Sequence, residues 1–134
     1  MNIILLSGGS GKRLWPLSND VRSKQFIKLF KNKDKYESMV QRVYRQITTI
    51  DADAKITIAT SKSQASSIKN QLGEKTSICV EPCRRDTFPA IVLAVSYLHD
   101  ELGVSSNEAV VVCPVDPYVD ETYYESVEIL HKLA

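Results

Sequence analysis

The sequence lacks several features that would place the protein outside the class of ordinary globular domains. Among its 134 residues, 17 basic and 16 acidic side chains leave a net charge of only +1. A chain so nearly neutral has no strong field to attract nucleic acid or an anionic membrane. No apolar stretch approaches the ~20 residues that a membrane-spanning helix requires. We therefore expect no nucleic-acid partner and no membrane partner.

Cysteine is also scarce, and the three cysteines fit neither a disulfide framework nor a zinc site. An odd number of cysteines, in a chain whose first apolar run is too short for a secretion signal, favours a reducing compartment. Cys79 and Cys83 are separated by three residues, and no second pair follows them to complete a zinc site. We therefore expect a cytoplasmic protein in which Cys79, Cys83 and Cys113 are small, buried apolar side chains near strand ends.

The remaining composition is that of one folded domain without linkers, repeats or low-complexity segments. Hydrophobic residues make up 43% of the chain, and its length lies within the range of about 100–150 residues in which single cores commonly form. Short apolar runs alternate with longer amphipathic segments. The runs are continuous, which is typical of strands buried on both faces of a parallel sheet. They lie at residues 3–6, 55–59, 77–80 and 109–113.

The segments between these runs have apolar residues at helical spacing. Asp86 or Thr87 is the expected N-cap of the helix over residues 88–102, and Gly103 is expected to end it. Gly73 is expected to close the helix over residues 63–72. Successive strand–helix repeats predict an α/β fold, Rossmann-like and three-layered, with a mostly parallel sheet and helices on both faces. In such a fold, ligands bind beyond the carboxyl ends of the strands. The predicted helices span residues 36–47, 63–72, 88–102 and 121–134.

The loop after the first run, GGSGKRLWPLS at residues 8–18, is rich in glycine and carries two adjacent cations. Backbone N–H groups of its glycines can approach and wrap an anion. Lys12 and Arg13 supply positive charge for phosphate oxygens. The loop therefore predicts a phosphate-binding site.

Two familiar phosphate-binding patterns do not describe this loop. A P-loop needs glycine where Leu6 stands and serine or threonine where Arg13 stands. A dinucleotide-binding fingerprint needs a small residue where Leu14 stands. The loop belongs to some other class of phosphate-binding sequence.

Three segments together resemble the sugar-phosphate nucleotidylyltransferase family, and most of all its mannose-1-phosphate guanylyltransferase branch. Residues 8–18, followed by SKQF at 23–26, are similar to the family's N-terminal signature. EPCRRDTFPAI at 81–91 resembles its second motif, and PVD at 114–116 its metal-binding motif. The resemblance implies a fold of the nucleotide-diphospho-sugar transferase type. Residues 1–134 would form a single nucleotide-binding domain, the N-terminal part of the family's catalytic domain, so the expected fold is truncated.

The reaction that the resemblance implies is transfer of GMP from GTP to mannose 1-phosphate, giving GDP-mannose and pyrophosphate. Both reactants are highly negative, so catalysis should depend mainly on positioning and charge neutralisation. Gly8, Gly9 and Gly11 would wrap the triphosphate. Arg13 would stabilise the leaving pyrophosphate, and Lys12 would add a second positive charge.

Two further charged residues complete the implied catalytic centre. Lys24 matches a lysine that contacts the α-phosphate or the sugar phosphate, and Asp116 matches a ligand of Mg²⁺. The family usually has proline before this lysine and histidine after this aspartate, whereas this chain has Ser23 and Pro117. Considered without the resemblance, Lys24 could equally be a solvated lysine and Asp116 a turn residue.

The resemblance assigns the segment after the third run to the nucleotide base and ribose. The segment precedes a predicted helix, and a helix N-terminus favours bound anions. Asp86 and Thr87 could equally serve only as helix caps. The residues expected to contact the nucleotide are Glu81, Arg85, Asp86, Thr87, Pro89 and Ala90.

Two alternatives to the guanylyltransferase hypothesis stay open. Related branches share the glycine loop and use UTP, dTTP or CTP with other sugar 1-phosphates. A nucleotide-binding module without turnover is the alternative from a different class, because the chain lacks a second metal-binding aspartate and the sugar-binding residues that the family would supply. We expect the isolated chain to bind nucleotide without turnover, and its unfinished sheet edge to favour a homo-oligomer.

Overall fold

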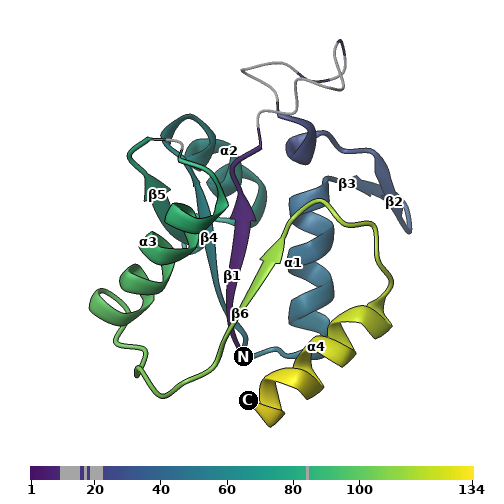
Figure 1. The fold of residues 1–134 in the computed structure, drawn as a ribbon. Helices are drawn as coiled ribbons and strands as arrows, with labels where there is room; N and C mark the ends of the chain where they lie inside the picture. The colour runs from purple at the N-terminus through teal and green to yellow at the C-terminus, as the bar shows by residue number, and fades with distance from the viewer. Residues whose placement is uncertain (10–15, 17, 19–22, 84) are drawn as a thin grey trace.

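The central sheet is built from the four apolar runs of the sequence. The computed structural model describes residues 1–9, 16, 18, 23–83 and 85–134. Side chains on both faces of the sheet are buried in apolar clusters, which explains why the runs are continuous. The predicted parallel sheet is confirmed (Figure 1). Its four strands lie in the order β5 (Ser77–Glu81), β4 (Lys55–Ser61), β1 (Asn2–Ser7) and β6 (Val110–Pro114).

Helices cover both faces of this sheet, because successive side chains of a strand point to opposite sides. Ile3 and Leu5 of β1 share one core with α1, α2 and α4, whereas Ile4 shares the other core with Ala94 and Leu98 of α3. In Figure 1, α3 accordingly lies on the opposite side of the strands from α1 and α4. The expected three-layer arrangement is confirmed. The helices are α1 (Met39–Ile50), α2 (Lys62–Leu72), α3 (Thr87–Asp100) and α4 (Glu121–Leu133).

The segment before α1 differs from the prediction. A short 3-10 helix, η2 (Lys24–Phe26), leads into an antiparallel hairpin of β2 (Phe30–Asn32) and β3 (Lys35–Glu37). The helix predicted over residues 36–47 is therefore wrong at its first three positions and begins at Met39. The reason is a capping box at Ser38: its Oγ accepts from the Gln41 backbone N–H at 3.3 Å, and Gln41 Oε1 accepts from the Ser38 N–H at 3.1 Å.

The other predicted helices are confirmed, with small differences at their ends. Gly73 follows α2 at φ 107°, a conformation that glycine adopts readily. Helix α3 ends at Asp100, two residues before the predicted end, and Gly103 lies beyond it at φ 66°. Asp86 is the N-cap of α3, but its side chain makes no capping hydrogen bond.

Two of the three cysteines are buried as predicted. Burial raises the pKa of the Cys79 and Cys113 thiols, which therefore remain protonated at neutral pH. Cys83 is exposed because it lies in the loop after β5, so the prediction of burial is wrong for this residue. All three are free thiols.

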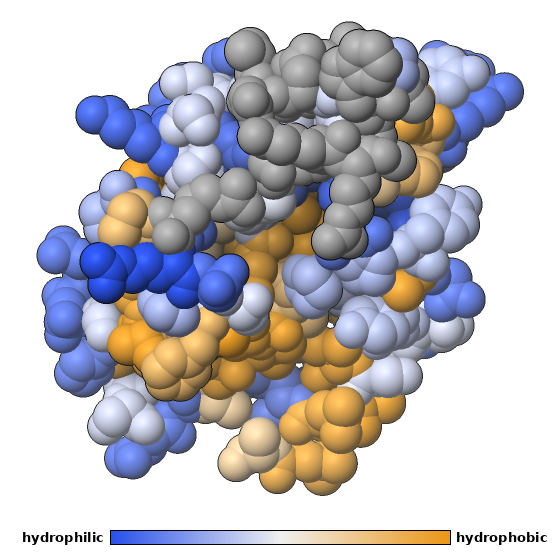
Figure 2. Space-filling model, turned by 45° about the horizontal axis from the view of Figure 1, so that its top comes forward, coloured by the Kyte–Doolittle hydropathy of each residue, from blue (hydrophilic) through white to orange (hydrophobic). Residues whose placement is uncertain are grey.

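Large apolar side chains remain on the surface of β6 and of the helices α3 and α4. Among the described strands, β6 pairs only with β1, so its other side is open. Figure 2 shows apolar surface at the centre and lower edge of one face. Large exposed apolar side chains include Val92 and Val95 of α3, Val112 of β6, and Leu130 and Leu133 of α4. Within the described part of the chain, no helix is long and apolar enough to cross a bilayer.

Candidate functional site

The carboxyl ends of the strands bring separate motifs together at one edge of the sheet. In the strand register, Ser7 pairs with Thr60 and Ser61 pairs with Glu81, so the start of the glycine loop lies beside the ends of β4 and β5. A Cβ atom added to Gly8 would lie only 3.3 Å from Glu81 Oε1. Gly8 of the first motif and Glu81 of the second are therefore direct neighbours.

Lys24 and Asp116, 92 positions apart in the sequence, form an ion pair at the same edge. Lys24 Nζ donates to Asp116 Oδ2 at 2.9 Å, and the two side chains are 28% and 48% exposed. Lys24 comes from η2, after the glycine loop, and Asp116 from the loop after β6. The structure thus joins the first and third motifs. It also leaves both charged groups accessible to a ligand.

Asp116 fits the Mg²⁺ ion that the family resemblance implies, as one ligand of a site that the substrate would complete. In the described ranges, no three His, Cys, Asp or Glu side chains gather into a metal-binding group. Mg²⁺ is commonly held by only one or two carboxylates together with substrate phosphates. A half-exposed carboxylate at a strand end meets that requirement.

The loop that carries Asp116 is fixed to α1 by contacts that the sequence did not predict. The Arg42 guanidinium lies 4.3 Å from the ring centroid of Tyr118 and donates from Nη2 to Val119 O. Gln46 Nε2 donates to the same carbonyl at 3.0 Å. Two bonds and a cation–π contact thus hold the loop within a few residues of Asp116. No local signal in the sequence reveals this link, because its members lie more than 70 positions apart.

The start of the glycine loop is held by side chains from η2, from its N-cap residue and from β4. Ser7 O accepts from Gln25 Nε2 at 3.1 Å and from Thr60 Oγ1 at 2.9 Å. Gly9 O accepts from Ser23 Oγ at 2.9 Å, so the serine that replaces the family's usual proline has a buried bonding role. Gly8 and Gly9 are thus placed with the site. The predicted phosphate-binding residues Gly11, Lys12 and Arg13 lie outside the described residues.

The segment predicted to contact the base and ribose runs along the surface between β5 and α3. The side chain of Glu81 is half-buried beside Gly8, and Ala90 is buried in the first turn of α3. Asp86 adopts φ 63°, which is uncommon for a residue other than glycine. Since its side chain makes no capping bond, capping does not account for Asp86. Exposed members of the segment are Arg85, Asp86, Thr87 and Pro89.

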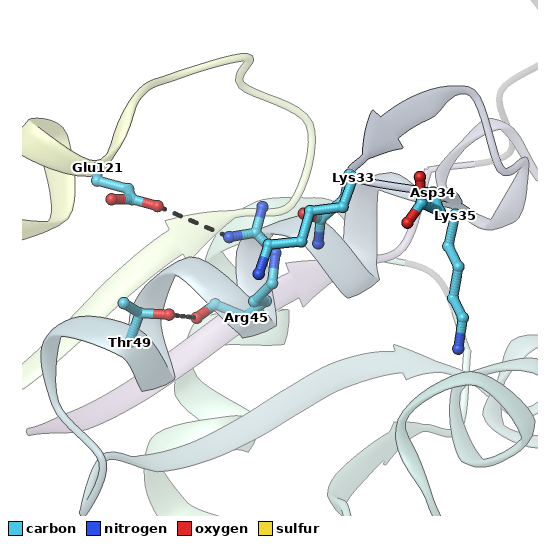
Figure 3. Close-up of a pocket in the computed structure, with 7 residues that line it drawn as sticks. Lys33, Asp34, Lys35, Arg45, Thr49 and Glu121 are labelled. Atoms are coloured by element: carbon cyan, nitrogen blue, oxygen red, sulfur yellow. Dashed lines mark hydrogen bonds and ion pairs between the residues drawn. The ribbon is translucent and has the colours of Figure 1, made fainter.

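An open pocket of about 630 Å³ lies away from these motifs, between the β2–β3 turn and α1 (Figure 3). The one arginine among its three cations is matched by acids: Arg45 pairs with Glu37 at 2.8 Å and approaches Glu121 at 3.7 Å. The hydrogen bond from Arg45 is the main cause that lowers the pKa of Glu37, and burial opposes it. The pocket therefore mixes cationic and acidic side chains and lies apart from the edge at which the three motifs meet. It is lined by Asn32, Lys33, Asp34, Lys35, Arg45, Thr49 and Glu121.

Comparison with known proteins agrees with the resemblance of the motifs. A family model described as nucleotidyl transferase matches residues 2–133. The xanthan biosynthesis protein XanB of Xanthomonas campestris pv. campestris (strain B100) is 42% identical over 94 residues, covering 68% of this chain. A mannose-1-phosphate guanylyltransferase of Salmonella montevideo is 29% identical over 136 residues, covering 98% of it.

A solved structure supports the fold over the whole chain. The structure from Thermus thermophilus, described as a mannose-1-phosphate geranyltransferase, matches with a TM-score of 0.79 and 27% sequence identity. The match covers 99% of this chain and 37% of that one. The chain spans 19% of the length of the Xanthomonas protein and 27% of the Salmonella protein.

Proposed function

The chain belongs to the nucleotidyl transferase family, and we propose that it forms the triphosphate-binding part of a sugar-1-phosphate nucleotidyltransferase. The observation that carries the proposal is the meeting of the glycine loop, Lys24 and Asp116 at the carboxyl ends of β1 and β6. Transfer between two polyanions needs backbone donors, a cation and a metal-binding carboxylate in one place. These three kinds of group converge at this edge of the sheet.

Within that class, we propose that the nucleotide is GTP and the sugar substrate is mannose 1-phosphate. Residues 81–91 resemble the second motif of the guanylyl branch, and the Salmonella relative carries that activity in its name. UTP, dTTP or CTP with another sugar 1-phosphate is the alternative within the family. The proposed contacts to the base and ribose are Glu81, Arg85, Asp86, Thr87, Pro89 and Ala90.

In the proposed reaction, an oxygen of the sugar 1-phosphate attacks the α-phosphorus, the bond to the β-phosphate oxygen breaks, and pyrophosphate leaves. Lys24 neutralises negative charge on the α-phosphate or the sugar phosphate. Asp116 would hold Mg²⁺, which when bound supplies further charge neutralisation at the phosphate oxygens. The proposed groups around the triphosphate are Gly8, Gly9, Gly11, Lys12 and Arg13.

Titration of the 134-residue chain with GTP, UTP, dTTP and CTP in the presence of Mg²⁺ tests both levels of the proposal. We expect binding to all four to depend on Asp116, with GTP bound most tightly. An Asp116→Asn variant should lose the part of the affinity that depends on Mg²⁺. Absence of binding to every nucleotide contradicts the proposal. Equal or tighter binding of another base contradicts only the guanylyl assignment.

A nucleotide-binding unit without turnover is the second candidate for this chain by itself. It is favoured by the fraction of the relatives that the chain spans, 19–27%. Pyrophosphate release with GTP, Mg²⁺ and mannose 1-phosphate separates the two candidates. We expect binding without release, and robust release that disappears in Asp116→Ala would contradict that expectation.

We also propose that the chain acts in the cytoplasm and that it self-associates through the open side of β6. The side of β6 that no described strand pairs, and the exposed apolar side chains of β6 and α4, support self-association. Sedimentation velocity over a range of concentrations tests it, and a monomer throughout that range would contradict it.

A further inference from the structure

Gln64, in the first turn of α2, uses both ends of its carboxamide group at the start of the glycine loop. Its Nε2 donates to Gly9 O at 3.3 Å. Its Oε1 accepts from Gln25 Nε2 at 2.9 Å and from Thr60 Oγ1 at 3.1 Å, a hydroxyl shared with Ser7 O. Because one end donates and the other accepts, these partners fix the orientation of the amide.

The partners of Gln64 are themselves buried and bonded to the same loop. Thr60 is fully buried and Gln25 is 2% exposed. Both donate to Ser7 O, one residue before the first glycine. Gln64 therefore belongs to a cluster that binds carbonyl oxygens on both sides of Gly8, at Ser7 and at Gly9.

Bonding of these carbonyl oxygens decides which side of the loop backbone offers donors. In a trans peptide, the C=O and the N–H point in opposite directions. Since Ser7 O points toward Gln25 and Thr60, the N–H of Gly8 points away from them. Holding the Ser7 carbonyl oxygen against the protein leaves the Gly8 N–H, rather than a repulsive oxygen, for an anion.

We propose that Gln64 is a positioning residue for triphosphate binding. It acts through the Gly9 carbonyl and through Gln25 and Thr60, which hold the Ser7 carbonyl, rather than by touching the nucleotide. The inference rests on the proposed function, because it requires that the glycine loop binds phosphate. The lack of charge on the cluster also suits this role. Its members are neutral amides and hydroxyls, so they orient the backbone without adding negative charge beside a polyanion.

Two substitutions separate the Gly9 bond from the rest of the cluster. Gln64→Met keeps the length of the side chain and removes all three of its hydrogen bonds. Gln64→Glu keeps an acceptor for Gln25 and Thr60, replaces the donor toward Gly9 O with an oxygen and adds a negative charge. The glutamate variant therefore keeps the test decisive if loss of the whole cluster impairs folding.

Gln71 provides a matched control on the same helix. Its Nε2 donates to Phe26 O at 3.0 Å, and its Oε1 accepts from Ser38 Oγ at 2.6 Å. It thus ties α2 to η2 and to the N-terminus of α1, with the same chemistry as Gln64, but away from the glycine loop. Gln71→Met should cost similar stability without altering the loop.

The experiment measures the affinity of the 134-residue chain and these variants for GTP and for inorganic tripolyphosphate, each with Mg²⁺, together with thermal unfolding. We expect Gln64→Met to lower the affinity for both anions about fivefold. This is the effect of losing one neutral hydrogen bond of about 1 kcal/mol. Gln64→Glu should lower both affinities by about tenfold or more. The part of this loss that exceeds the loss in Gln64→Met comes from the added charge, so added salt should reduce it. Gln71→Met should keep the original affinities despite a similar fall in melting temperature.

The two anions separate failure of this inference from failure of the proposed function. Unchanged affinity for tripolyphosphate in both Gln64 variants would overturn the positioning role, as would an equal loss in Gln71→Met. Binding of tripolyphosphate without tighter binding of any nucleoside triphosphate would overturn the proposed function and leave the positioning role standing. Failure of the original chain to bind either anion would overturn both.

Discussion

The ion pair between Lys24 and Asp116 should contribute little to stability and much to ligand binding. The two groups are 2.9 Å apart, but their side chains are 28% and 48% exposed. Water screens such a pair, and exposed pairs usually couple by only about 0.2–1 kcal/mol. We therefore expect a double-mutant cycle of Lys24→Gln and Asp116→Asn to give a coupling free energy of unfolding below about 1 kcal/mol.

GTP binding should respond more strongly than stability to the two substitutions, because in the complex Lys24 faces a phosphate and Asp116 faces a metal ion instead of each other. A hydrogen bond to a charged group contributes about 1.5–3 kcal/mol. Lys24→Gln should thus weaken GTP binding roughly 10- to 100-fold, since 1.4 kcal/mol corresponds to a factor of ten. Asp116→Asn should abolish the dependence of GTP affinity on Mg²⁺, whereas Lys24→Gln should preserve that dependence.

Urea unfolding and calorimetric titration of the four proteins of the cycle provide the measurements. Lys69→Gln is the matched control, because Lys69 also pairs with a carboxylate, Glu74, but at 3.6 Å and at the end of α2. This control should change neither the free energy of unfolding nor the GTP affinity appreciably. A coupling free energy above about 2 kcal/mol would show that the pair is structural. GTP affinity unchanged by either substitution would refute the placement of the site.

Three other perturbations probe the surroundings of this pair. Gly8→Ala should alter the free energy of unfolding by less than about 1 kcal/mol, because only the carboxylate end of the Glu81 side chain must shift. The same substitution should weaken GTP binding. A large loss of stability in urea would contradict the geometry. Arg42→Met should cost about 1–2 kcal/mol in urea unfolding and weaken Mg²⁺-dependent GTP binding, since it removes two of the three contacts that hold the loop after β6 and leaves only the bond from Gln46. Unchanged binding would separate this loop from the site. Because the hydrogen bond from Arg45 lowers the pKa of Glu37, that bond stabilises the fold above the ordinary value of 4.5, and its contribution is lost as pH falls through the lowered pKa. Glu37→Gln should flatten the fall of stability in acid, and an unaltered profile would rule out this contribution.

The succession of strands and helices along the chain could be predicted from the sequence, because short-range patterns encode it. Continuous apolar runs require burial on both faces, which parallel strands covered by two helical layers provide. The same patterns place the motifs at strand ends, where parallel topology brings them to one edge. The hairpin over residues 30–37 escaped notice because its strands are short and Tyr36 continues the helical spacing of α1. A capping box at Ser38 decides the boundary instead.

The individual candidates for chemistry were also accessible, because each lies within a recognisable local motif. Glycines beside adjacent cations predict phosphate binding, whereas an aspartate after a buried strand predicts metal binding only when the resemblance of the motifs is added. The sequence alone thus determined the fold class and the edge of the sheet at which the motifs meet, and it supplied the residues of the candidate site. It did so through spacing over a few residues, the range over which composition and periodicity carry information.

Only the tertiary structure decided which of these residues meet and what holds them. Lys24 reaches Asp116 across 92 positions, and Gln64 reaches Gly9 across 55. Such pairs leave no local trace, because their partners are chosen by the strand order and by the packing of α1 and α2 on the sheet. Hydrogen-bonding side chains such as Gln64 and Arg42 look like ordinary solvated positions on a helix until the loop they hold is placed against them. Long-range packing, rather than local pattern, therefore positions the site.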